Sequence, residues 1–271
     1  MPVRTIELRE AGSLHGFIRR MVSPGDLGER IKPFVFLDFI HGTIPPGAGF
    51  GFHPHSGIAT LTYQLDADVS YEDTTGQKGL VAATGLEWMR AGGGTWHQGF
   101  IHAQGQTVTG FQLWLALPPG VEDGPSEGIY VSPADVPQVG NVRVLLGEYG
   151  GAVNPIPAPA PVTYLDVVLD DGERWAYDPP ATHEIAWVFV YRGRARVGGA
   201  PVSAELVVLD RTGTIEVVAE GPTRVLVGIG VPHDHPLVLG SHSVHTSPAS
   251  LARGVARIRD IGVELKRDGR R

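Results

Sequence analysis

The chain contains no cysteine among its 271 residues. Disulfide bonds and thiolate ligands are therefore excluded, and any metal would have to be held by histidine, carboxylate or amide groups. Long apolar runs are also absent, since no stretch approaches the roughly 18 apolar residues of a membrane-spanning helix. Residues 1–7 lack the apolar core of a signal peptide. We therefore expect a cytoplasmic protein without a membrane partner.

Positive charge is scarce and scattered. The chain has 22 Lys and Arg residues against 29 Asp and Glu residues, for a formal net charge of −7. No basic stripe of the kind that nucleic-acid binding requires is visible, so we expect no nucleic-acid partner. The basic residues at positions 266–271 are interpreted as a solvated chain end, with a nucleic-acid or membrane contact as the alternative.

Turn-forming residues are abundant, with 37 glycines and 22 prolines dispersed between short apolar runs. This pattern is typical of many strands joined by tight turns, and it predicts an all-β sandwich or barrel. Similar strand patterns follow one another in both halves of the chain, and residues 183–193 take the place that residues 53–65 hold earlier. We interpret this as an internal duplication. The proline-rich segment 154–161 is interpreted as a domain marker.

Three parts of the chain are expected: an N-terminal barrel over residues 1–135, a C-terminal barrel over 136–247, and a helix over 248–271 that packs on the barrels. Ser247 is a suitable N-cap for this helix, with Pro248 at its first position. Its predicted buried face is spaced at helical intervals and consists of Leu251, Val255, Ile258, Ile261 and Leu265.

Three histidines form the candidate functional site. His53 and His55 lie two residues apart at the start of an alternating run, so on a strand they point to the same face. His97 follows a glycine-rich turn at residues 92–94. If the three imidazoles share a barrel interior, they can hold one divalent metal and leave positions for substrate or water. Among the tryptophans, Trp96 is expected to line this pocket, whereas the core is expected to hold Trp88, Trp114, Trp175 and Trp187.

Several motifs, in this order, resemble the pirin family of bicupin proteins. The matching segments are residues 33–38, 53–57, 87–97, 110–114, 230–233 and 244–247. The resemblance implies two tandem cupin barrels, which are double-stranded β-helices of jelly-roll type. It also implies one metal ion, usually iron, in the N-terminal barrel only. Oxygen-dependent cleavage of flavonols such as quercetin is a reported family activity, and some members are nuclear regulators that act through protein partners.

This sequence departs from the family at the carboxylate ligand. The family has a glutamate two residues after the third histidine, where this chain has Gly99, and the general cupin pattern has one where this chain has Ala59. Three interpretations stay open: an extra open position, a replacement ligand, or a weak or lost site. His102 is the candidate replacement, with Gln98 and Gln104 behind it. Glu87 is interpreted as an outward-facing strand carboxylate.

The leading functional hypothesis is an oxidoreductase similar to quercetin 2,3-dioxygenases that acts on a small flavonol-like aromatic. Its metal would be iron, with Zn, Ni, Cu, Mn or Co as alternatives, and no catalytic residue beyond the ligands is assigned. A second hypothesis is a non-catalytic regulatory protein that acts through a protein partner and has a weak or absent metal site. A third is a metal-free or zinc-binding pocket for a small molecule.

Overall fold

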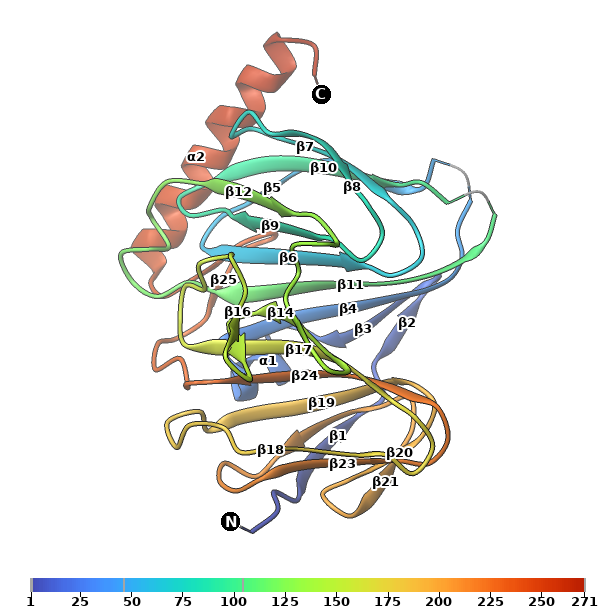
Figure 1. Cartoon of the computed structure of the whole chain (residues 1–271). Coiled ribbons are helices and arrows are strands. Elements are labelled where there is room, and N and C mark those ends of the chain that lie inside the picture. Colours follow the sequence, from blue (N-terminus) through green and yellow to red (C-terminus); the bar gives the residue numbers. More distant parts are fainter. Residues whose placement is uncertain (1, 46, 104, 271) are drawn as a thin grey trace. The chain divides into compact units, whose positions relative to one another are not determined.

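The computed structural model describes residues 2–45, 47–103 and 105–270 and divides into two compact units. Barrel I comprises Leu14–Arg30, Phe34–Asp135 and His233–Arg271, and barrel II comprises Met1–Ser13, Ile31–Pro33 and Val136–Pro232. In the described part of the chain, nearly all regular structure is β-strand (Figure 1). The expected all-β fold with a C-terminal helix is confirmed. The two helices are α1 (Leu27–Ile31) and α2 (Pro248–Arg267).

Barrel I is built from a seven-stranded and a four-stranded antiparallel sheet. The larger sheet has the order β12 (Glu127–Val131), β9 (Leu86–Arg90), β6 (Ile58–Gln64), β11 (Thr107–Ala116), β4 (Phe34–Thr43), β3 (Ile18–Val22) and β2 (Ser13–His15). The smaller sheet has the order β5 (Gly49–His55), β10 (Thr95–Ile101), β7 (Val69–Asp73) and β8 (Lys78–Val81). A short pair, β25 (Val238–Leu239) and β26 (Val244–His245), follows near the C-terminus.

Barrel II repeats this strand order. Its larger sheet has the order β1 (Ile6–Glu10), β22 (Leu206–Leu209), β19 (Ile185–Arg192), β24 (Thr223–Gly230), β17 (Val162–Leu169), β14 (Val142–Leu146) and β13 (Gln138–Val139). The smaller sheet has the order β18 (Arg174–Tyr177), β23 (Ile215–Ala219), β20 (Ala195–Val197) and β21 (Ala200–Val202), and β15 (Glu148–Tyr149) pairs with β16 (Ala152–Val153). Because β19 occupies the place of β6, the topology agrees with the duplication seen in the sequence.

The two units are not the continuous segments expected from the sequence. Strand β1 pairs with β22, with Ile6 opposite Leu209, so the N-terminal strand completes the sheet of barrel II. The proline-rich segment 154–161 lies inside barrel II and does not separate the units. Two hydrogen bonds of the Asn154 side chain hold the start of this segment in place. Its Nδ2 donates to the Val144 carbonyl at 2.8 Å, and its Oδ1 accepts from the Ile156 amide at 2.9 Å.

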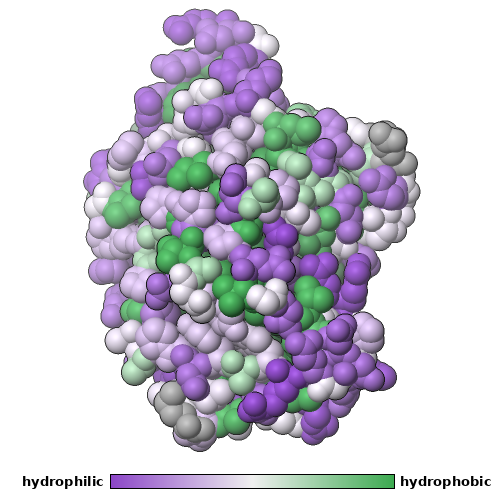
Figure 2. Space-filling view, viewed as in Figure 1, coloured by the Kyte–Doolittle hydropathy of each residue, from purple (hydrophilic) through white to green (hydrophobic). Residues whose placement is uncertain are grey.

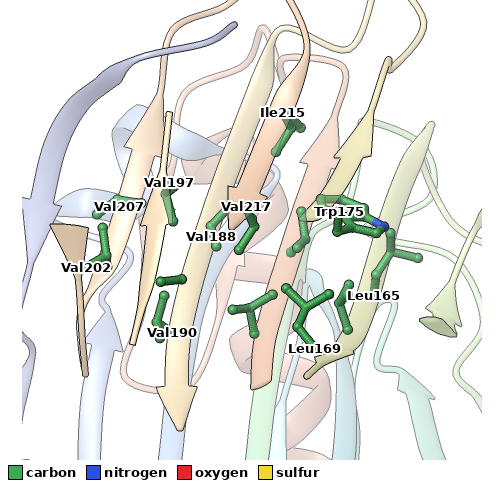
Figure 3. Close-up of a cluster of buried hydrophobic side chains, with 14 of the residues drawn as sticks. Leu165, Leu169, Trp175, Val188, Val190, Val197, Val202, Val207, Ile215 and Val217 are labelled. Atoms are coloured by element: carbon green, nitrogen blue, oxygen red, sulfur yellow. The ribbon is translucent and has the colours of Figure 1, made fainter. Parts of the chain in front are cut away.

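The interior of barrel II is filled with apolar side chains (Figure 3). Trp175, Val188 and Val217 are buried in one cluster together with Leu165 and Ile215. Burial of aliphatic and aromatic side chains of this kind is the main favourable term in folding. The core of barrel II is therefore built from apolar side chains.

Helix α2 begins as predicted, because the Ser247 side chain accepts from the Ser250 amide and Pro248 occupies the first turn. Its buried face agrees with the prediction only at Ile261 and Leu265. Leu251 and Ile258 are half-buried, Val255 is 46% exposed, and the small residues Ser250, Gly254 and Gly262 are buried instead. A Cβ atom at Gly254 would come within 2.5 Å of Ser56 Oγ and 2.6 Å of His245 Nε2. The glycine therefore allows a close approach that the apolar periodicity alone did not reveal.

The basic C-terminal end is only partly solvated. Arg270 donates to Glu72 on β7, and its guanidinium lies 5.4 Å from the centre of the Phe52 ring on β5. The end of α2 at the top of the view is mainly hydrophilic, and hydrophobic and hydrophilic residues are interspersed on the rest of the face shown (Figure 2). Neither helix in the described part of the chain is long and apolar enough to cross a membrane.

Candidate metal centre

Adjacent strands β5 and β10 bring the three predicted histidines together. They pair antiparallel, with His97 directly opposite His53 and Thr95 opposite His55. Each histidine offers one ring nitrogen that lies within 4.8 Å of those of the other two, and this is the only such group of three or more potential ligands among the described residues. The ring centres of His53 and His97 are 4.3 Å apart. The structure therefore brings the three predicted histidines together in one cluster.

Hydrogen bonds fix the rings of His53 and His55. Nδ1 of His53 donates to the Gly51 carbonyl at 2.8 Å, and Nδ1 of His55 donates to the His242 carbonyl at 3.1 Å. Because a carbonyl oxygen only accepts, these contacts place the proton on Nδ1 and leave Nε2 of each ring with a free lone pair. Such an arrangement is common among metal-binding histidines.

Burial keeps these imidazoles neutral. Desolvation lowers the pKa of His53 to about 4, with further lowering by the nearby His97. The pKa of His55 is also well below its usual range, first because of burial and then because of His97 and His53. Neutral imidazole is the form that binds metals, so the site does not need to lose protons before it takes up an ion at neutral pH.

His97 provides the test of whether a metal fits this site. It is buried, and neither of its ring nitrogens has a hydrogen-bond partner. A buried polar atom without a partner is costly, and it is rare in native proteins unless an ion or water completes it. A metal ion among the three imidazoles would satisfy His97, so the residues present fit one.

Glu87 lies beside the cluster, and the expectation that it faces outward was wrong. It is only 6% exposed, lines the same cavity as the histidines and places Oε1 at 3.6 Å from Nδ1 of His97. Its strand, β9, lies between β6 and β12, and Leu86 and Trp88 are buried on the opposite face. Both faces of this strand are covered, so sequence alternation could not tell which one points into the barrel.

The two empty carboxylate positions are not equivalent. Gly99 lines the cavity, whereas Ala59 does not. On β6, Thr62 and Gln64 line the cavity, so alternation places Ala59 on the opposite face of the sheet. A glutamate at position 59 would therefore point out of the cavity, whereas position 99 lies at the cavity wall.

Two of the replacement ligands considered from the sequence, His102 and Gln98, are not part of the cluster. His102 is exposed and lies outside the group of mutually close ligand atoms. Gln98 points away, as its strand position predicted, and its Nε2 donates to Glu72 at 3.1 Å. Gln104 lies outside the described residues.

A cavity of about 620 Å³ opens beside the histidines and has an aromatic wall. The Phe36 and Trp114 rings stack with centres 3.9 Å apart, and the Trp114 and His55 rings pack edge to face with centres 4.9 Å apart. Trp114 was expected in the core, and Trp96 was expected here. Instead, Trp96 packs under α2, with its Nε1 donating to the Ile258 carbonyl at 2.7 Å.

Polar groups of the cavity lie opposite the histidines. Thr62 Oγ1 donates to Gln112 Oε1 at 3.2 Å, which leaves the Gln112 Nε2 donor buried without a partner. The buried Oε1 of Gln64 also lacks a partner. At another part of the wall, Arg20 forms a two-point ion pair with Asp38 and lies over the Phe36 ring. Phe36, Asp38 and Gln112 lie in segments that carry the family resemblance, but no local pattern predicted their position at this wall, because strands distant in sequence bring them together.

The described residues of barrel II contain no comparable histidine cluster. The strand pair β18 and β23 of barrel II occupies the place that β5 and β10 hold in barrel I. Within this pair, Tyr177 lies opposite the first residue of β23. By this register, the places of His53, His55 and His97 are taken by Trp175, Tyr177 and Val217. Apolar and aromatic packing thus replaces the metal ligands.

These features define a two-barrel cupin with a histidine cluster consistent with a metal site in one barrel. A model of the family "Pirin" matches residues 17–115. A Pseudomonas aeruginosa protein provisionally named a quercetin 2,3-dioxygenase is 32% identical over 237 residues, covering 82% of each chain. The chain belongs to the pirin family.

Solved structures agree with this fold. A quercetin 2,3-dioxygenase from Acinetobacter baumannii matches with a TM-score of 0.87 at 24% identity, over 94% of this chain and 96% of that one. A bacterial pirin from Escherichia coli, determined in complex with nickel(II), matches with a TM-score of 0.68 at 20% identity, over 84% of this chain and all of that one. At these identities the likeness establishes the fold.

Proposed function

We propose that this chain binds one divalent metal ion, iron in the first instance, through Nε2 of His53, His55 and His97. We further propose that it cleaves a flavonol-like aromatic with dioxygen. The single observation that carries the proposal is the cluster of three histidine side chains at the wall of an aromatic-lined cavity. The relatives named as quercetin 2,3-dioxygenases support the choice of substrate class.

The bound metal would supply Lewis acidity toward substrate oxygen atoms and a redox partner for dioxygen. With three protein ligands, it retains positions for both. The protein orients the ligands: the carbonyls of Gly51 and His242 hold the rings of His53 and His55. Trp114, packed edge-on against His55, excludes water from that side of the cluster.

The rest of the cavity suits a planar, oxygen-rich substrate. The stacked Phe36 and Trp114 rings give a flat apolar wall for an aromatic system. Gln112 offers an unused hydrogen-bond donor and Gln64 an unused acceptor, as expected for groups that bind the hydroxyls of an aromatic ring. Cavities of about this size bind ligands with the mass of a flavonol.

Aerobic incubation with quercetin, with and without added Fe(II), tests the activity. We expect metal-dependent loss of the flavonol absorbance together with dioxygen uptake, both abolished in His97→Ala and retained in His102→Ala. Metal-replete protein that shows neither signal would overturn the dioxygenase proposal and favour the non-catalytic regulatory alternative. Metal analysis of purified protein tests the site separately, since a metal content unaffected by His97→Ala would exclude the three-histidine ligand set.

A further inference from the structure

Two histidines of the cluster donate from Nδ1 to a backbone carbonyl: His53 to that of Gly51 and His55 to that of His242. The Glu87 carboxylate lies 3.6 Å from Nδ1 of His97. This distance exceeds that of a hydrogen bond, and His97 is the one ring of the three that no hydrogen bond holds in place.

We propose that Glu87 is a positioning residue that accepts a hydrogen bond from Nδ1–H of His97 and so directs Nε2 of His97 to the metal. The inference rests on the metal-binding part of the proposed function and is independent of the reaction catalysed. A carboxylate that holds a metal-bound imidazole fixes the ring and raises its basicity. All three rings would then bind through the same nitrogen.

The register of the sheet places Glu87 for this role. Glu87 lies opposite Thr62 on the adjacent strand β6, and both side chains line the cavity. It therefore reaches His97 from the larger sheet, whereas the three histidines all stand on the smaller one. The side chain is buried, so water competes little for the contact.

The charges around the metal site also support this role of Glu87. Three imidazole ligands bring no negative charge to a divalent ion, and Gly99 provides no carboxylate. The lining of the cavity contains two carboxylates, Asp38 and Glu87. Asp38 is paired with Arg20, so Glu87 is the one that faces a metal-site ring, and its charge acts on the site through His97.

Glu87→Gln tests the proposal, with Asp38→Asn as the matched control that removes a carboxylate from the same cavity. Affinity for Ni(II) and Co(II) is measured by competition with a chelator, and melting curves of the metal-free variants establish that they fold. We expect Glu87→Gln to weaken binding by about 10- to 100-fold, Glu87→Asp to restore part of the loss, and Asp38→Asn to change affinity less than about 3-fold.

Spectroscopy separates positioning from direct ligation. The Co(II) absorption bands should show the same coordination number in the wild type and in Glu87→Gln, and long-range ¹H–¹⁵N spectra of the Zn(II) form should show His97 protonated at Nδ1. Three outcomes would each overturn the proposal. They are equal metal affinities of wild type and Glu87→Gln, the loss of an oxygen ligand in the Co(II) spectrum of Glu87→Gln, and metal bound to Nδ1 of His97. A wild-type chain that binds no metal would overturn the three-histidine site, and the role of Glu87 with it.

Discussion

Ser56 Oγ lies 2.9 Å from Nε2 of His245, although 189 residues separate them in the chain. Ser56 directly follows the metal-site residue His55, and His245 precedes the N-cap of α2. Nδ1 of His245 contacts the Ser250 hydroxyl at 2.7 Å, and that hydroxyl donates to Asp123 at 2.8 Å. A buried polar network therefore ties the strand that carries two histidines to the C-terminal helix.

This network should contribute cooperatively to stability. We expect Ser56→Ala and His245→Ala each to lower the free energy of unfolding by about 1–3 kcal/mol, because each leaves buried partners unsatisfied. The double variant should lose less than the sum of the two, with a coupling of roughly 0.5–3 kcal/mol. Urea unfolding of the wild type, the two single variants and the double variant measures the coupling free energy. Strict additivity would show that the contact between Ser56 and His245 has no energetic role.

Gly254→Ala should destabilise the protein even though alanine favours helices. Helix propensity alone predicts a gain of about 1 kcal/mol, but a Cβ atom here would collide with Ser56 and His245. We expect a melting temperature several degrees lower. Ala252→Gly, at an exposed position of the same helix, gives the propensity effect alone. A higher melting temperature for Gly254→Ala would contradict the close approach.

The stability of the metal-free protein should fall as the pH is lowered from 7 to 5. The pKa of His53 is about 4 in the folded state and about 6.5 when unfolded, so the unfolded chain takes up the proton first. The loss begins near pH 6.5 and amounts to about 2 kcal/mol at pH 5 from His53 alone.

Urea unfolding at three pH values between 5 and 7 measures this slope. We expect His53→Asn to flatten it, whereas the same change at the exposed His102 serves as the control. The lowered pKa of His55 has the same sign and adds to the loss. A slope that is identical in His53→Asn and wild type would show that His53 titrates alike in the folded and unfolded states.

Gly99→Glu should rebuild the family carboxylate. A Cβ atom at this position meets only ordinary contacts at 3.6 Å with Ser70 and Val69, so the backbone accepts a side chain. We expect tighter binding of Ni(II), because a fourth ligand and a negative charge are added to the site. Gly99→Gln, of the same size but uncharged, is the control. Equal Ni(II) affinities of Gly99→Glu and wild type in a chelator competition would contradict the placement of position 99.

The sequence by itself determined the β-rich fold, the two similar halves, the helix cap at Ser247 and the three histidines. These features depend on local rules: alternation along a strand, the chemistry of turns and caps, and the pairing of His53 with His55 on one face. His97, which follows the glycine-rich turn at residues 92–94, was the third candidate, and the resemblance carried by residues 87–97 supported that choice.

Only the tertiary structure decided which groups surround that cluster. Glu87 and Trp114 lie on strands with both faces buried, where alternation cannot distinguish the barrel interior from the outer face. The His242 carbonyl reaches His55 across 187 residues of chain, and Gly254 is buried because of a contact between distant segments. Such contacts arise from strand order and register, which no local pattern in the sequence encodes.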